Sequence, residues 1–274
     1  MIRLVAVLLI ATSCAHGPSR TGRVDAPTPQ VRAVFPSPGD VPENILRFYI
    51  YFTEPMREGN FLQHIRLWDL ETGEELTGAF FDNLYELWSP DRKRITVLVD
   101  PGRQKTGLAA HERLGRVFKP GRRYRLEVLP SWRSIAGIPL RTVYTHRFDA
   151  TVEDRSRVDP GTWTLHLPPP LTSESLRVEF HERVDHVSAQ RFLAVLDEGQ
   201  NPVPGRWELF DGEREARFVP AKDWGTDLRD YSLLVSVRFE DVVGNNVNAA
   251  FEHSVTENIA APRNRLYQRR FGPE

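Results

Sequence analysis

Cysteine is almost absent from this chain of 274 residues, which contains only Cys14. A single thiol cannot form an intramolecular disulfide, and it leaves no cysteine elsewhere for zinc sites, iron–sulfur clusters or nucleophilic catalysis. A strong charge of one sign is lacking too, because the formal net charge is −1 at pH 7. We therefore expect no nucleic-acid partner, since nothing would draw the protein to a polyanion at long range.

Long apolar runs are also missing. The run at residues 4–10 is far shorter than the roughly 20 residues that span a bilayer, and no later run approaches that length. Arg3 precedes this run and small residues follow it, which is the pattern of a secretory signal peptide. The sequence thus predicts export, and no transmembrane helix.

The residues that end this signal, ATSC at 11–14, resemble the lipobox of bacterial lipoproteins, in which cleavage leaves the cysteine as an acylated first residue. The resemblance implies a signal peptide over 1–13, acylation of Cys14 with chains such as palmitate, and a membrane-anchored lipoprotein of the cell envelope. Ala15 stands where inner-membrane lipoproteins typically carry aspartate, which favours the outer membrane or the cell surface. A plain secretory signal that ends near a cysteine is the alternative.

Catalytic motifs are absent as well: no nucleophile elbow, phosphate loop, dinucleotide fingerprint or EF-hand spacing occurs. HERLG at 111–115 begins like a zinc HExxH motif, but glycine replaces the second histidine. HERVD at 181–185 offers His181 and Asp185, but we expect a strand there, which separates them by roughly 13 Å. We therefore expect no enzyme, no metal and no cofactor. Loop residues that converge into an active site remain the least favoured alternative.

What the chain has is short alternating runs between frequent turn residues, with 21 prolines and 18 glycines. Apolar residues of one parity recur in five places: Leu46, Phe48, Ile50 and Phe52; Ile95, Val97 and Val99; Tyr124, Leu126 and Val128; Leu176, Val178 and Phe180; and Tyr231, Leu233, Val235 and Val237. Each run predicts a strand with one buried face. An all-β fold follows.

An internal repeat organises these strands. The segment 46–56 is answered by 176–186, the turn ending at Gly78 by the turn ending at Gly205, and the segment from Tyr124 by the segment from Tyr231. The last pair aligns Gly137 with Gly244, in turns that favour a residue able to adopt positive φ. About twenty extra residues precede Tyr124 in the first copy. The repeat predicts two tandem domains.

Three motifs of the first copy resemble landmarks of bacterial Ig-like domains of the S-layer (SbsA) type: PSPGDVP at 36–42, FTEPM at 52–56 and AGIPL at 136–140. The second copy retains VGNNV at 243–247. The resemblance implies an antiparallel sandwich that serves as spacer, scaffold or interaction module without catalysis. We expect two tandem antiparallel Ig-like β-sandwiches over 31–150 and 159–256, after a lipidated tether at 14–30, with a linker at 151–158 and a flexible basic tail at 257–274.

Two ligand sites are conceivable on this framework. Calcium could bind the acidic residues Asp149, Glu153, Asp154 and Asp159 near the junction, although a solvated linker is favoured. Sugar could stack on some of the six tryptophans, and an accessory carbohydrate-binding lipoprotein is the main alternative function. Trp132 is expected in the core, because it aligns with Phe239.

The extra segment of the first copy is the remaining candidate. It carries a basic cluster with few acidic neighbours: Arg103, Lys105, Arg113, Arg116, Lys119, Arg122, Arg123 and Arg125. The first five are candidate ligand-binding residues for an anionic envelope polymer or lipid, or for another envelope protein. A solvated loop that protects an edge strand is favoured over this interpretation. The expected function is a lipid-anchored, non-catalytic structural or binding module of the envelope.

Overall fold

The computed structural model describes residues 27–82, 84–104, 109–251 and 266–271. In the first half the strands are β1 (Val31–Phe35), β2 (Gly39–Pro42), β3 (Arg47–Phe52), β4 (Ile65–Asp69), β5 (Leu87–Trp88), β6 (Arg94–Leu98), β7 (Arg123–Val128) and β8 (Tyr144–Thr151). Its helical turns are η1 (Phe61–His64), α1 (Pro101–Gln104) and α2 (Ala109–Leu114).

In the second half the strands are β9 (Thr164–His166), β10 (Leu176–Glu179), β11 (Leu193–Leu196), β12 (Gly205–Phe210), β13 (Glu215–Pro220), β14 (Ser232–Val235) and β15 (Tyr267–Arg270). Its helical segments are α3 (His186–Phe192), η2 (Pro160–Thr162), η3 (Asp211–Glu213) and η4 (Leu228–Asp230). The second half therefore repeats the strand-rich plan of the first.

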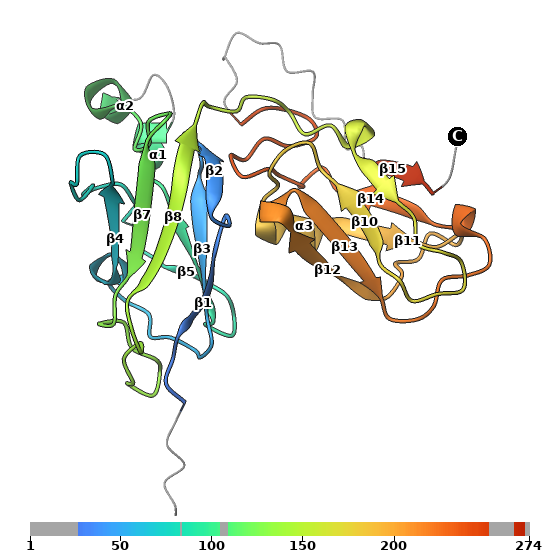
Figure 1. The fold of residues 1–274 in the computed structure, drawn as a ribbon, viewed down its shortest axis with the longest axis horizontal. Helices are drawn as coiled ribbons and strands as arrows, with labels where there is room; N and C mark the ends of the chain where they lie inside the picture. Colours follow the sequence, from blue (N-terminus) through green and yellow to red (C-terminus); the bar gives the residue numbers. More distant parts are fainter. Residues whose placement is uncertain (1–26, 83, 105–108, 252–265, 272–274) are drawn as a thin grey trace, which may run out of the picture.

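The strands form two sandwiches in tandem. Sheets β1-β3-β6-β5 and β2-β8-β7-β4 build the first, and sheets β12-β13-β10-β9 and β11-β14-β15 build the second. The predicted all-β fold is confirmed. The expectation of purely antiparallel sheets is wrong at one place, because β2 runs parallel to β8. Figure 1 shows the second sandwich beside the upper part of the first, joined by a linker that leaves β8 at its end.

Each sandwich has its own core. Phe48, Ile50 and Phe52 on β3 are at most 1% exposed, as their parity predicts. Val178 on β10, the repeat partner of Phe48, is fully buried in the second core, and Phe180, the repeat partner of Ile50, is 5% exposed. The aligned turn residues agree as well, since Trp132 and Phe239 are both buried and Gly137 and Gly244 have φ of 82° and 85°. The internal repeat is thus a structural repeat.

The chain's last described segment belongs to the second sandwich. Residues 267–270 form β15 and pair with β14, and Phe271 is 2% exposed against Trp224 and Tyr231. The prediction of a flexible tail is wrong for these residues, because strand pairing and one buried ring hold them. The rest of that tail, 252–265 and 272–274, lies outside the described residues.

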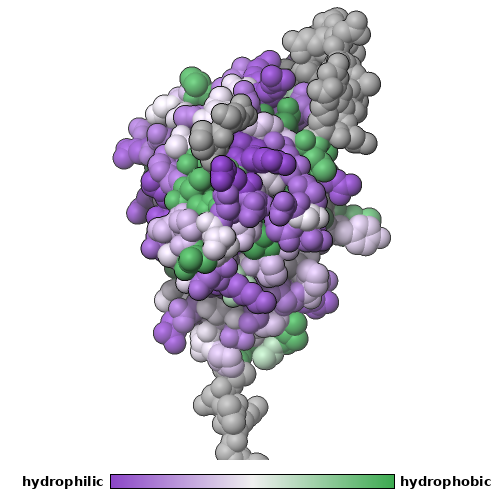
Figure 2. Space-filling view, turned by 90° about the vertical axis from the view of Figure 1, so that its right-hand side faces the viewer, coloured by the Kyte–Doolittle hydropathy of each residue, from purple (hydrophilic) through white to green (hydrophobic). Residues whose placement is uncertain are grey.

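The start of the first sandwich also differs from expectation. Within the predicted tether, residues 27–30 lie against the domain, because Arg141 donates its backbone N–H to the Pro29 carbonyl and Gln30 donates to the Thr53 hydroxyl. Cys14 and the predicted signal peptide lie outside the described residues. In the part of the chain that the structure describes, no helix has the length and apolarity needed to cross a membrane. Figure 2 views the side on which the second sandwich lies, where the surface is mainly hydrophilic.

Candidate functional site at the junction of the two domains

One face of strand β3 packs in the core of the first domain, and its other face contacts the second domain. Because side chains alternate along a strand, Phe48 and Ile50 enter the first core while Arg47, Tyr49 and Tyr51 point the other way. That second face meets the second domain, and Tyr49 is only 5% exposed there. The junction is therefore built on a strand that is buried on both sides.

Asp185 is the centre of the contact. It precedes α3 and caps this helix, since Oδ1 accepts a hydrogen bond from the Ser188 N–H at 2.8 Å. The Tyr49 hydroxyl donates to Oδ1 and Oδ2 at 3.0 and 2.8 Å. Arg47 Nε lies 3.5 Å from Oδ2, and its Nη2 pairs with Glu240. We call Arg47, Tyr49, Asp185 and Glu240 the Asp185 cluster. Burial and the Asp185 charge raise the pKa of Tyr49, which keeps its hydroxyl a donor.

A second polar contact lies beside this cluster. Arg183 donates to the carbonyls of Ser37 and Pro38 at 2.8 and 3.2 Å. In return the Ser37 N–H donates to Glu213 Oε2 at 2.9 Å. Gly212 lies beside this guanidinium with φ of 58°, a backbone conformation that favours glycine, and a Cβ there would lie 2.6 Å from Arg183 Nη2 and displace it. Side chains and backbone of both domains thus interlock.

Ring and turn contacts complete the junction. Phe35 and His186 stack with centroids 3.5 Å apart and an interplanar angle of 19°. Burial, together with the charges of Arg94 and Arg32, lowers the pKa of His186 to about 4, so this ring is neutral at pH 7. At Gly244 a Cβ would lie 2.6 Å from Leu46 Cδ1, and the turn glycine therefore also serves the approach of the domains.

Three carboxylates gather at the edge of the same junction. Asp154 from the linker, Glu182 and Asp241 each place an oxygen within 4.8 Å of the others. Asp241 is 1% exposed and accepts hydrogen bonds from the N–H groups of Val243 and Asn245, both at 2.9 Å. Burial, with Asp154 and Asp159 adding repulsion, raises the pKa of Glu182 to about 7. Burial and the Glu182 charge raise that of Asp241 to about 8.

This trio can relieve its repulsion in two chemical ways. It can share protons near neutral pH, or it can hold a hard cation, because carboxylate oxygens are the ligands that Ca²⁺ prefers. Of the four acidic residues singled out from the sequence, only Asp154 takes part. Glu153 pairs with Arg116 and Arg155, and Asp159 caps η2.

The expected strand at 181–185 is wrong. Strand β10 ends at Glu179, a bend follows, and Asp185 begins α3. The bend lets neighbouring residues diverge: His181 contacts the Thr162 carbonyl, Glu182 joins the carboxylate trio and Asp185 faces Tyr49. His181 and Asp185 therefore have separate partners.

Among its described residues, the basic segment of the first domain forms no joint site with the junction residues above. Arg103 donates to the carbonyls of Gly115 and Arg116 at 3.0 and 3.1 Å. Arg116 pairs with Glu43 and Glu153, and Arg122, Arg123 and Arg125 each pair with a carboxylate. Arg113 and Lys119 are exposed, while Lys105 lies outside the described residues. Much of the cluster therefore braces the fold.

Sequence reasoning missed the Asp185 cluster. The available signal was in β3 itself, where RFYIYF at 47–52 carries aromatic residues on the face expected to meet water. Tyr49 and Tyr51 at alternate positions indicate a second covered face. Glu182 and Asp241 gave no such signal, because residues distant in sequence meet only after folding.

Comparisons with known proteins assign no family to the chain. No protein-family model and no curated protein sequence matches it. Among solved structures, domains 1–6 of the surface layer protein SbsC align with 76% of this chain and 23% of that one, at 12% identity and a TM-score of 0.32. The N-terminal part of the bacterial S-layer protein SbsC aligns over 80% of this chain and 42% of its own, at 14% identity and a TM-score of 0.31.

A further alignment is with the MG0-NIE-MG1 domains of alpha-2-macroglobulin from Escherichia coli. It covers 76% of this chain and 65% of that one, at 12% identity and a TM-score of 0.29. The chain thus spans only about a quarter to two-fifths of the S-layer chains above. The finer resemblance to SbsA-type domains stays a prediction.

Proposed function

We propose that this chain is a lipid-anchored cell-envelope protein whose two Ig-like sandwiches form one rigid, non-catalytic arm. The observation that carries the proposal is the buried polar junction. Domains joined only by a linker move relative to each other by default. Here Tyr49 donates to both oxygens of Asp185, which is 3% exposed, and Arg183 reaches two carbonyls of the other domain. A shift that kept this face covered but moved it out of register would leave these groups buried without partners, at a cost of about 1–3 kcal/mol each.

The attachment points support the role of an arm. The chain enters the first sandwich beside Thr53 and Arg141, at the end of β3 and the start of β8. The linker leaves from the other end of β8 (Figure 1). A lipid on Cys14 would be separated from residue 27 by residues 15–26. The first sandwich would then stand between the membrane and the second.

The lipobox-like residues 11–14 and the Ig-like landmarks support the envelope location. The partners that fit this arm are the membrane through its lipid, and another envelope protein or an anionic polymer of the envelope. The outer membrane or the cell surface is the proposed place, since Ala15 follows the cysteine.

Cell fractionation tests the anchor. Cys14→Ser removes the acylated thiol, so we expect the protein to move from the membrane fraction to the soluble fraction. Ser13→Ala keeps a small residue before the cysteine and serves as the matched control, which should stay membrane-bound. Retention of the Cys14→Ser protein in the membrane would contradict the proposal.

A further inference from the structure

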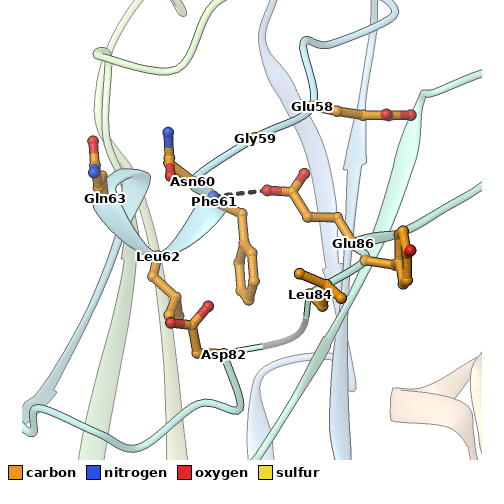
Figure 3. Close-up of a pocket in the computed structure, with 10 residues that line it drawn as sticks. Glu58, Gly59, Asn60, Phe61, Leu62, Gln63, Asp82, Leu84 and Glu86 are labelled. Carbon is orange, nitrogen blue, oxygen red and sulfur yellow. Dashed lines mark hydrogen bonds between the residues drawn. The ribbon is translucent and has the colours of Figure 1, made fainter.

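The first sandwich has a groove away from the domain junction. It is a cavity of about 600 Å³, with one wall formed by residues 58–63, including η1, and the other by residues 82 and 84–86 before β5. Figure 3 shows Leu62, Asp82 and Leu84 around the ring of Phe61, with Glu58 and Glu86 above. We call it the η1 groove.

The two walls are fixed to each other. Glu86 accepts hydrogen bonds from the Phe61 N–H at 2.9 Å, across the groove, and from Trp88 Nε1 at 2.7 Å. Phe61 is 4% exposed and belongs to the first core. The floor of the groove is therefore already ordered by the fold. Ligand binding would then cost less conformational entropy of the protein.

The wall formed by residues 82 and 84–86 exposes apolar side chains that are not packed in the core. Leu84 is 89% exposed and its neighbour Tyr85 is 79% exposed. The six tryptophans are less exposed than these two side chains. Four are buried and two are half-buried: Trp132, Trp163, Trp207 and Trp224, and then Trp68 and Trp88. Adjacent exposed apolar side chains at the rim of a cavity are typical of a contact site.

The charges around the η1 groove decide which ligand class fits. None of its described lining residues is a lysine or arginine, which disfavours phosphate groups and other anions. Glu58 is already paired with Arg92 at 3.2 Å, and both Glu86 oxygens accept hydrogen bonds. A cationic peptide would therefore find one uncommitted carboxylate, that of Asp82. A neutral ligand with many hydroxyls fits better.

We propose that the η1 groove binds a neutral glycan. The Tyr85 ring and the Leu84 side chain offer a surface for the apolar C–H face of a pyranose ring. Asp82 accepts from hydroxyls, and the exposed amides of Asn60 and Gln63 both donate and accept. A cavity of about 600 Å³ has the size of small-molecule sites, which run from about 300 to 1,000 Å³. The site goes beyond the structural arm and does not depend on the lipid anchor.

Saturation-transfer NMR on the full chain in detergent tests the site, with cellotriose, maltotriose and chitotriose as probes. We expect transfer to at least one trisaccharide. Tyr85→Ala should weaken that binding about tenfold or more, and Asp82→Asn should weaken it several-fold. Phe210→Ala removes a surface ring of the second domain and is the matched control, which should bind like the wild type. Unchanged melting temperatures show that the variants are folded.

Octalysine is the competing probe. No transfer to any of the three saccharides would overturn the proposal, and so would transfer that Tyr85→Ala leaves unchanged. Octalysine binding that Asp82→Asn abolishes, without saccharide binding, would assign a cationic ligand instead. Tyr85→Ala should leave membrane retention unchanged, so failure of the glycan site and failure of the anchored arm are distinguishable.

Discussion

The two sandwiches repeat one strand plan but close their last sheet differently. In the first, β8 pairs with β7 on one side and with the parallel strand β2 on the other. In the second, the corresponding strand β15 pairs with β14 alone among the described residues. In the part of the chain that the structure describes, the last strand of the first sandwich thus has a neighbour on each side, whereas the four-residue strand β15 has one.

The difference indicates which segment of each domain matters most for its stability against unfolding. Phe271 packs directly after β15 and inserts a ring into the second core, so edge pairing and core filling depend on the same short segment. The first domain spreads these tasks, because β8 spans 144–151 and contributes Phe148 and Ala150 to its core. The second domain should therefore be easier to unfold by a change at its terminus.

The largest expected effect comes from Phe271→Ala. Truncation of a buried aromatic ring costs about 3–5 kcal/mol in lost burial and cavity formation. We expect the unfolding transition of the second domain to move to much lower temperature in calorimetry. Arg270→Ala, one residue earlier and exposed, should change stability by less than about 0.5 kcal/mol. Equal melting of both variants would mean that β15 does not support the domain.

Tyr49→Phe should have the next largest effect, on the coupling between the domains. The change removes a hydrogen bond donor to a buried carboxylate, which is worth about 1.5–3 kcal/mol. We expect one joint calorimetric transition in the wild type and two separated transitions in the variant. Tyr144→Phe removes a half-buried hydroxyl outside the junction and should leave the transition joint. A variant that still melts as one unit would show that the Asp185 cluster does not couple the domains.

Glu182→Gln probes the carboxylate trio through pH. Because burial raises the pKa of this carboxyl to about 7, the folded state holds its proton more tightly than the unfolded chain. Its contribution therefore favours folding at low pH and is lost as pH rises from about 4.5 to about 7. The variant should be more stable than the wild type at pH 8 by about 1 kcal/mol, less than the full shift implies, since the side chain is partly exposed.

A control variant and a calcium titration make this test more specific. Glu198→Gln, exposed in the turn after β11, is the matched control for the loss of one negative charge. Millimolar calcium separates protons from cations, because a bound ion would stabilise the wild type and not Glu182→Gln. A wild type that is more stable than the variant at pH 8 without calcium would contradict the repulsion among these carboxylates.

The smallest expected effect concerns the segment that only the first domain has. Reversing Arg113 and Lys119 to Glu changes exposed side chains, so stability should stay within about 0.5 kcal/mol. Arg116, Arg122, Arg123 and Arg125 are already paired with carboxylates, so the wild-type segment should bind vesicles with anionic lipid only weakly. The double reversal should therefore change this binding little. A large, salt-sensitive loss of vesicle binding would instead assign this segment a ligand.

Much of the fold could be predicted because burial leaves a periodic trace. Alternation located the cores of β3, β6, β7, β10 and β14, and the repeat paired Gly137 with Gly244. Strand β15 left no such trace, because Tyr267 and Arg269 are only half-buried on a four-residue edge strand. Helix α3 was missed because the repeat extended a strand into it, although Asp185 is a good N-cap residue.

The junction was less predictable than the cores. Its members come from distant segments: the turn at 35–38, β3, the linker, the bend after β10, η3 and the turn at 240–246. Tertiary contact alone unites them. Asp154 could be noticed because it stands in a polar linker, but its partners Glu182 and Asp241 could not. The η1 groove likewise depends on how two loops of the first domain meet.

A distance measurement tests the rigid arm most directly. Spin labels at Thr77→Cys and Glu198→Cys, both exposed and in different domains, can be read by pulsed electron paramagnetic resonance after Cys14→Ser removes the native thiol. We predict a single narrow distance distribution, which broadens when Tyr49→Phe and Arg183→Ala are added. A wild-type distribution that is already broad, and unchanged by these substitutions, would contradict the account.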